Sequence, residues 1–311
     1  MSLLEEEFRQ LGMSAVAERT AANDGVISRA ALSALPLANG ETRRVIDTSK
    51  GIWNPRDLVA TLSIVSSSTG PYDDRHVDGG LFHYDYRVGS TQGDNAKLRR
   101  AFELELPIIF LRKIETGVYV PVFPTYVVAD DTHNHQFILA LDESLRFLAN
   151  PLSPSVAEKR YAERIVRARL HQPEFRARVI RAYRATCTIC SLKHPDLLDA
   201  AHIISDSENG GDPIVTNGLS LCKIHHAAYD RNLLGISADY TVHLNRELLD
   251  EVDGPMLRHG LQEMHARSTF LHSNRNSLPG LERLSVASQH SRSLAARQYR
   301  CSACLRPRRL G

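Results

Sequence analysis

Two short patterns of metal-ligand residues constrain most strongly how this chain can fold. Cys187-x-x-Cys190 is followed, after residues 191–221, by Cys222-x-x-His225. Two thiolates with this spacing on a tight turn can bind one ion, and a second pair completes the tetrahedron that structural zinc prefers. We therefore expect a zinc ion, bound by Cys187, Cys190, Cys222 and His225, to join the two segments. Because four protein ligands fill such a site, its role is structural rather than catalytic.

The composition is that of a soluble protein from a reducing compartment. The five cysteines are odd in number and few for a secreted disulfide scaffold. No apolar run approaches the roughly 18 residues that a membrane helix needs, and the acidic start MSLLEEEFRQ lacks the pattern of a signal peptide. We expect no membrane partner. The 38 Lys+Arg and 36 Asp+Glu give a net charge of +2, an average that can hide a sorted distribution.

The first half of the chain is rich in expected strands. Residues 1–150 are expected to form an α+β domain on a curved sheet or barrel, with an early helix at 4–11 and another at 95–104. Runs of β-branched and aromatic residues separated by Gly, Pro, Asp and Asn predict strands at 58–67, 81–88, 107–115, 118–128 and 136–141.

The composition changes after the turn-rich segment 150–155. Residues 156–184 contain nine Lys and Arg against three Glu, and their periodicity predicts two amphipathic helices, the second opened by Pro173. The basic face is either a solvated surface or one that faces DNA phosphates. Further on we expect a strand at 196–204, a helix at 219–230, a strand pair at 233–236 and 240–244, a helix near 255–267 and a basic tail. These segments form two predicted parts, 156–250 and 251–311.

Three polar residues near the expected zinc ligands are not needed for zinc. They are His202, Asn217 and His226. A neutral imidazole can take a proton from water near pH 7, and a second imidazole can help to hold a divalent cation against a phosphate. His226 follows the expected zinc ligand His225, so its side chain projects about 100° around the helix from it. An Asn side chain can fix the loop and the base by hydrogen bonds.

These residues carry a resemblance to a known family. Cys187-Thr-Ile-Cys190, Ala201-His202-Ile203 and the run Asn217-Gly-Leu-Ser-Leu-Cys222-Lys-Ile-His225-His226 resemble the zinc-containing HNH (ββα-metal) endonucleases, as found in McrA-like enzymes. The resemblance covers roughly 175–245. It implies that His202 is the general base, that Asn217 is the middle Asn, and that His226 binds a catalytic Mg²⁺ or Mn²⁺ ion.

One position departs from the pattern of that family. Many HNH nucleases have an acidic metal ligand just before the base, and this chain has Ala201 there. Asp199 shares a strand face with Ala201 and is one candidate for the missing ligand, although an ordinary solvated carboxylate is the simpler interpretation. Asp230 is expected to be structural.

The N-terminal part resembles a second family. The segment from Tyr72-Asp-Asp74 to Leu81-Phe-His-Tyr84-Asp85-Tyr86 is similar to the SRA domain, which reads modified cytosine by flipping the base out. The resemblance implies that Tyr72 and Tyr84 stack on the flipped base and that Asp74 or Asp85 accepts a hydrogen bond from it. The alternative is that Tyr84, which alternates with Phe82 and Tyr86, belongs to the core.

Together the two resemblances predict a modification-dependent DNA endonuclease of the type IV restriction kind. It would bind double-stranded DNA that contains modified cytosine, with 5-methylcytosine as the expected base, act as a homodimer and reside in a bacterial cytoplasm. Two alternatives remain. One is an HNH nuclease of phage, toxin or mobile-element type without modification dependence, and the other is a non-catalytic DNA-binding module. Cys301 and Cys304 are expected to be free thiols in the tail.

Overall fold

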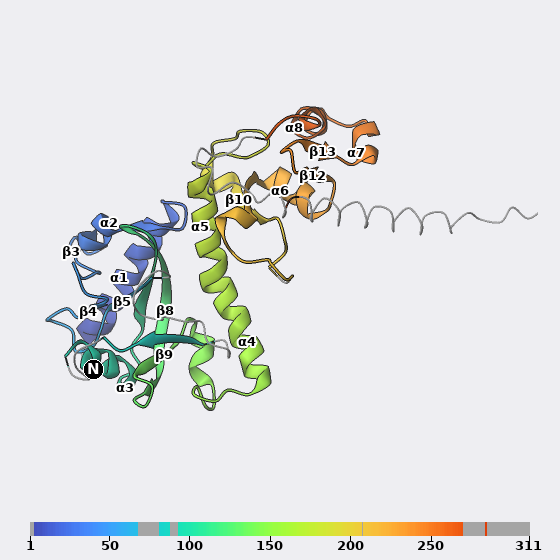
Figure 1. Cartoon of the computed structure of the whole chain (residues 1–311). Coiled ribbons are helices and arrows are strands. Elements are labelled where there is room, and N and C mark those ends of the chain that lie inside the picture. The colour runs from blue at the N-terminus through green and yellow to red at the C-terminus, as the bar shows by residue number, and fades with distance from the viewer. Residues whose placement is uncertain (1–2, 68–80, 88–92, 207, 270–283, 285–311) are drawn as a thin grey trace, which may run out of the picture. The chain divides into compact units, whose positions relative to one another are not determined.

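The computed structural model describes residues 3–67, 81–87, 93–206, 208–269 and Leu284 (Figure 1). Contacts between residues divide the chain into two compact units, Met1–Ala177 and Arg178–Gly311, and each is described by itself. The expected boundaries at 150 and 250 remain predictions. Among the described helices, none is both long and apolar enough to cross a membrane.

A curled seven-stranded sheet forms the first unit, as the α+β expectation requires. Its main path runs β4-β5-β7-β8-β9-β6, and β1 pairs separately with β8. Only β5 and β7 are parallel; the other neighbours are antiparallel. The long strand β8 has register shifts against both β7 and β9, and such bulges bend a sheet. The strands are β1 (Ile27–Ser28), β4 (Ile52–Trp53), β5 (Ser63–Ser67), β6 (Phe82–Asp85), β7 (Ile108–Glu115), β8 (Val118–Asp131) and β9 (Gln136–Ala140).

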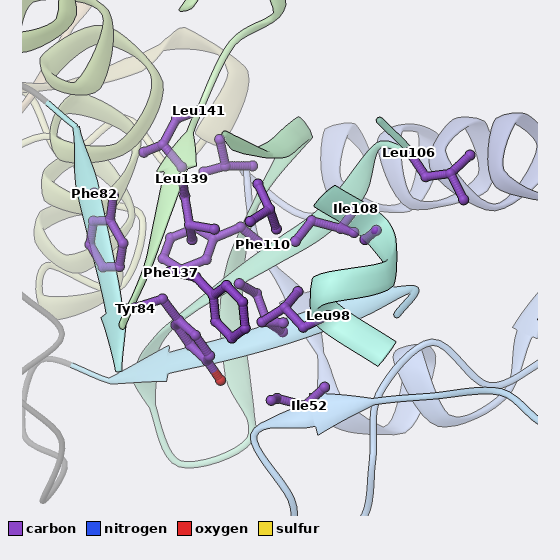
Figure 2. Close-up of a cluster of buried hydrophobic side chains, with 14 of the residues drawn as sticks. Ile52, Phe82, Tyr84, Leu98, Leu106, Ile108, Phe110, Phe137, Leu139 and Leu141 are labelled. Atoms are coloured by element: carbon purple, nitrogen blue, oxygen red, sulfur yellow. The ribbon is translucent and has the colours of Figure 1, made fainter. Parts of the chain in front are cut away.

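Both faces of the sheet are buried, which explains the unbroken apolar run in β7. Ile108 and Phe110 pack on one face with Phe82, Tyr84 and Phe137 (Figure 2). The alternate residues of β7 pack on the other face beside helix α1 (Leu3–Ala21). A strand covered on both sides is apolar at every position, whereas one with a solvated face alternates. Helix α3 (Asp94–Glu103) contributes to the first of these cores.

The expected strand at 58–67 is wrong in its first half, because residues 58–62 are irregular. The guanidinium of Arg9, on α1, donates to the carbonyl oxygens of Ala60 at 3.2 Å and Thr61 at 2.9 Å. Those oxygens therefore bond to a side chain. Helix α1 is also longer than the predicted 4–11, and its buried Arg9 ties it to this segment.

The two basic helices form one nearly continuous helical run, so the expectation that Pro173 opens a new helix is wrong. Helix α4 (Val156–Val166) passes through a π-helical turn, η2 (Arg167–His171), into α5 (Gln172–Ala182). Proline has no N–H and its ring crowds the carbonyl of the preceding turn. A π turn widens the backbone just before Pro173 and offers room for that ring.

The second unit contains a ββα arrangement. Strands β10 (Leu198–His202) and β11 (Gly218–Cys222) pair antiparallel, and helix α6 (Lys223–Asp230) follows β11 directly. The helix predicted at 219–230 thus begins four residues later than expected, at Lys223, because residues 219–222 belong to the buried strand β11. The strand pair predicted at 233–236 and 240–244 is confirmed: β12 (Leu234–Ile236) pairs with β13 (Val242–Leu244). The helix predicted near 255–267 is shorter, with α8 (Pro255–Gly260) followed by the 3₁₀ turn η5 (Gln262–Met264).

The smaller elements complete the description. They are α2 (Arg29–Ser33), β2 (Leu35–Pro36), β3 (Thr42–Arg43), η1 (Glu143–Phe147), η3 (Pro195–Leu197), η4 (Val215–Asn217) and α7 (Arg246–Asp250).

Candidate active site and metal centre

The four expected zinc ligands lie together. Their ligand atoms are all within 4.8 Å of one another, with Cys187, Cys222 and His225 buried and Cys190 exposed. The Sγ atoms of Cys190 and Cys222 are 3.9 Å apart. Four ligands around zinc at about 2.3 Å would place two sulfurs roughly 3.8 Å apart. The cluster thus has both the donor set and the spacing of a structural zinc site.

Local structure explains how the two pairs meet. The backbone N–H of Ser191 donates to the Cys187 carbonyl, which closes the tight turn that carries the first pair. Cys222 ends β11 and caps α6, so His225 falls in the first turn of that helix. The N–H of Cys222 also donates to the Cys187 sulfur at 3.3 Å. A strand end and a helix start therefore bring the second pair onto the first.

Contacts within the cluster shift the pKa values of its members in different directions, lowering that of Cys187 and raising those of Cys190 and His225. Hydrogen bonds from Cys190 and Cys222 hold the pKa of the Cys187 thiol far below its ordinary value. The Nε2 atom of His225 lies 2.9 Å from the carbonyl oxygen of Gly260, a partner that leaves Nδ1 to face the thiols. Burial lowers the pKa of His225, but its contacts with Cys187 and Cys222 raise it to about 9. Zinc binding at Nδ1 would therefore displace a proton.

His202 and Asn217 lie at the same end of the β10–β11 pair. His202 is the last residue of β10 and pairs in register with Gly218, the neighbour of Asn217. The fully buried Asn217 side chain accepts from the N–H of Ile204 at 2.9 Å and donates to the carbonyls of Ile204 at 3.0 Å and Asp212 at 3.1 Å. It thereby fixes the chain just after His202 and the loop that follows.

The environment of His202 favours its neutral form. Burial lowers the pKa of His202, the charge of His226 lowers it further, and the carboxylates of Asp206 and Asp230 oppose this change. A neutral imidazole at neutral pH is the form that can accept a proton.

His226 lies between two carboxylates. Its Nδ1 is 3.6 Å from Asp199 Oδ2, and its Nε2 is 3.4 Å from Asp230 Oδ2, one turn further along α6. Lys223 Nζ donates to both oxygens of Asp199 at 2.7 Å. Burial raises the pKa of Asp199, but the hydrogen bonds and charges of Lys223 and His226 bring it below its ordinary value.

A small cavity in the first unit adjoins two of the expected base-binding residues. It has a volume of about 200 Å³, and its lining includes Tyr84, Asp85, Gly51 and Val65. The Tyr84 hydroxyl lies 3.2 Å from the Gly51 carbonyl oxygen and 3.3 Å from that of Val65. Tyr84 is only 6% exposed and is part of the core, yet it also lines the cavity. Tyr72 and Asp74 lie outside the described residues, as do Cys301 and Cys304.

Sequence reasoning did not single out three of the residues at these sites. Lys223 lies within the HNH-like run, but the sequence indicated no role for its side chain. Its pairing with Asp199 depends on the angle at which α6 crosses β10. Gly51 lines the cavity. Gly211 lies so close to the Ser205 carbonyl oxygen that a Cβ would be 1.8 Å from it. The Gly210-Gly211 pair is the one signal that could have indicated a close approach of the backbone.

A larger groove of about 640 Å³ lies beside α1. Its walls include Arg146, which is paired with Glu105 and Glu143. None of the expected functional residues lines it, so size alone does not identify the site.

Among the comparisons with known proteins, the most direct match lies in the second unit. Residues 187–237 match the family model of the HNH endonucleases. No curated protein matches the chain.

Solved structures give more distant similarities. A modification-dependent TagI restriction endonuclease is 18% identical with a TM-score of 0.31, covering 78% of this chain and 86% of that one. The SUVH5 SRA domain in complex with hemimethylated CG DNA is 22% identical with a TM-score of 0.24, covering 30% and 72%. The type IV phosphorothioation-dependent restriction endonuclease ScoMcrA is 16% identical with a TM-score of 0.20, covering 53% and 49%. TM-scores this low assign neither a fold nor an activity.

Proposed function

We propose that this chain, whose residues 187–237 match the HNH endonuclease family, is a modification-dependent DNA endonuclease. Its first unit would recognise a modified cytosine, with 5-methylcytosine as the expected base, and its HNH domain would hydrolyse the DNA backbone. The observation that carries the proposal is the grouping of His202 at the end of β10, Asn217 in the turn η4 just before β11, and His226 on α6, next to the Cys₃His cluster.

Each residue has a role that its surroundings support. His202, kept neutral by burial, would take the proton from the water that attacks phosphorus. Asn217 would hold the backbone after the base in place through its bonds to Ile204 and Asp212. His226 would bind Mg²⁺ or Mn²⁺, which supplies positive charge to the scissile phosphate and the leaving oxygen. The zinc cluster would keep α6 aligned with the strand pair.

The modified base would enter the cavity beside Tyr84 and Asp85. Base flipping needs stacking and a hydrogen-bond acceptor to offset the energy of unstacking. We assign the stacking to Tyr72 and Tyr84, and the acceptor to Asp74 or Asp85. Tyr84 would serve as both core and pocket wall, since its ring is packed while its hydroxyl lies among the cavity residues.

The partner would be double-stranded DNA, with the basic stretch 156–184 contacting phosphates. An HNH site cleaves one strand, so cutting both would require a homodimer or two successive nicks. The proposed compartment is a bacterial cytoplasm.

The test compares DNA duplexes that differ only in their cytosines: unmodified, 5-methylated or 5-hydroxymethylated. We expect metal-dependent cleavage of modified DNA that exceeds cleavage of unmodified DNA. His202→Ala should lose about 10²–10⁴-fold in cleavage rate. His194→Ala, at a histidine that is 60% exposed, is the matched control and should cut normally.

Two results would contradict the proposal. Equal rates on all three duplexes would remove the base-reading function and leave a nuclease without modification dependence. Binding of DNA without cleavage, with either Mg²⁺ or Mn²⁺, would favour the non-catalytic module.

A further inference from the structure

The ring of His226 has one nitrogen facing each of two carboxylates, and these carboxylates are not equivalent. Asp199, on β10, is 26% exposed, whereas Asp230, on α6 itself, is 62% exposed. A cation can be bound by only one ring nitrogen in this arrangement, and the other must then carry the proton. Which nitrogen binds decides where the cation lies relative to His202.

Asp199 is held in place from its other side. Lys223 donates to both carboxylate oxygens at 2.7 Å, and Lys223 and His226 are both on α6. The strand residue Asp199 is thus fixed against two neighbouring positions of the helix. Asp230 has a different setting, because its side chain is exposed and its contact with His226 lies within a single helix. Asp199 is the better-anchored partner for the ring.

We propose that Asp199 is the positioning residue of His226, accepting from Nδ1–H and leaving Nε2 as the atom that binds the divalent cation. Metal-binding histidines are commonly oriented in this way by a carboxylate at the second nitrogen. The 3.6 Å separation is long for a hydrogen bond, and such contacts often tighten only when substrate binds. Lys223 would keep Asp199 ionised and in place. This inference rests on the proposed nuclease function.

The ring to which the assignment applies lies near the proposed base. The charges of Asp206, His226 and Asp230 all act on His202, so the His226 ring lies within electrostatic reach of the proposed base. With Nε2 as the ligand atom, a bound cation would share the Asp230 side of the ring. Asp199 then acts through His226 and not on the phosphate, which explains how a carboxylate two residues before the usual position could support the same chemistry.

The test measures metal binding by the full-length, zinc-loaded protein. Titration with Mn²⁺ alone, followed by calorimetry, should give an affinity about 10- to 100-fold weaker for Asp199→Ala than for the parent. Asp199→Asn keeps an oxygen that can accept from Nδ1–H, so it should retain most of the affinity. Asp196→Asn, at a carboxylate that is 80% exposed in the turn before β10, is the matched control and should bind as the parent does.

A second measurement reads the ring directly. Nitrogen NMR of histidine-labelled protein without Mn²⁺ should show His226 protonated at Nδ1 in the parent, with this preference lost in Asp199→Ala. Zinc content and the thermal transition are expected to stay unchanged in each variant, which separates positioning from misfolding.

Three outcomes would overturn the inference. Parent-like Mn²⁺ affinity in Asp199→Ala would show that the carboxylate does not position the ring. Equal losses in Asp199→Ala and Asp199→Asn would instead make Asp199 a direct ligand. Protonation of His226 at Nε2 in the parent would reverse the assignment. If Asp199→Ala binds Mn²⁺ like the parent while the parent still cuts modified DNA, only this inference fails and the proposed function stands. A parent that neither binds Mn²⁺ nor cuts DNA would overturn both the inference and the proposed function.

Discussion

At the scale of single residues, burial decides how His202 can work. The imidazole ends a strand and is half-buried, and removal from water disfavours its charged form. A base of this kind is ready to accept a proton over a wider pH range than an exposed histidine.

The pH dependence of cleavage should reflect this environment. Because the pKa of His202 lies below its ordinary value of 6.5, the neutral form persists below that pH. With saturating Mg²⁺ and single-turnover conditions, we expect the rate to fall on acidification with a midpoint below 6.5. A midpoint above this value would mean that another group controls the acid side or that His202 is not the base.

The lowered pKa of His202 also makes the stability of the folded protein fall as the pH falls. The unfolded chain binds a proton at His202 more readily than the folded chain does, so the contribution of this residue to stability is lost as the pH falls. Chemical denaturation of the parent at neutral and mildly acidic pH should show this loss, and His202→Gln should reduce it. An unchanged pH dependence in His202→Gln would assign the effect to other groups.

Some residue-level features followed from the sequence and others did not. The cysteine and histidine pairs could be predicted because each pair is local, with two ligands on one turn. The bond between Lys223 and Asp199 could not, because it joins residues on different elements and requires the angle at which α6 crosses β10.

At the scale of elements, helix α1 is attached to the first unit by a buried charge. Arg9 is 1% exposed and donates to Glu5 and to three backbone carbonyls, those of Ala60, Thr61 and Pro107. Arg9→Met should leave the buried Glu5 carboxylate without its charged partner and destabilise the protein by about 3–5 kcal/mol. Denaturant unfolding followed by circular dichroism measures this.

Arg19→Met provides the comparison for Arg9. Arg19 is an exposed arginine on the same helix, so its replacement should change stability little. Equal effects of the two substitutions would mean that the buried network contributes nothing specific.

The loop between β10 and β11 depends on one glycine. A Cβ at Gly211 would lie 1.8 Å from the Ser205 carbonyl oxygen, so the backbone must move. Gly211→Ala should therefore destabilise the protein by about 1–3 kcal/mol. It should also slow cleavage, because Asp212, next in the chain, accepts from Asn217. Gly235→Ala, where a Cβ meets nothing within 4 Å, is the control. Normal cleavage by Gly211→Ala would separate this loop from catalysis.

Strand and helix patterns differ in how well they reveal these elements. Five strands of the curled sheet could be predicted because their apolar runs are bounded by turn residues, whereas β1 and β4, with two residues each, are too short to show a pattern. Residues 219–222 could not be separated from the following helix, since every side chain of β11 is buried and no alternation marks it as a strand. The bends at 58–62 depend on Arg9, which is remote in sequence.

At the scale of the whole molecule, the two units should respond differently to loss of zinc. Cys187 and Cys222 belong to the core of the second unit, so the metal and that core should stabilise each other. Trp53 is the one tryptophan of the sequence and lies on β4 in the first unit. Its fluorescence therefore reports on the first unit alone.

A strong zinc chelator should remove the thermal transition of the second unit and abolish cleavage. The unfolding transition seen by tryptophan fluorescence should stay where it was, while far-ultraviolet circular dichroism loses part of its signal. Restoring zinc before the protein aggregates should restore the thermal transition of the second unit and the cleavage activity. Simultaneous loss of both transitions would mean that the units do not unfold independently.

The consecutive positions of His225 and His226 on α6 have a consequence for how such a chain can evolve. One ring contacts the thiols and the next contacts Asp199, and a single peptide bond separates the two residues. An insertion or deletion between them would turn every later side chain of the helix by about 100°. Under the proposed roles, a lineage cannot shift its structural anchor along this helix while keeping its reaction centre, so the two must be inherited as one unit.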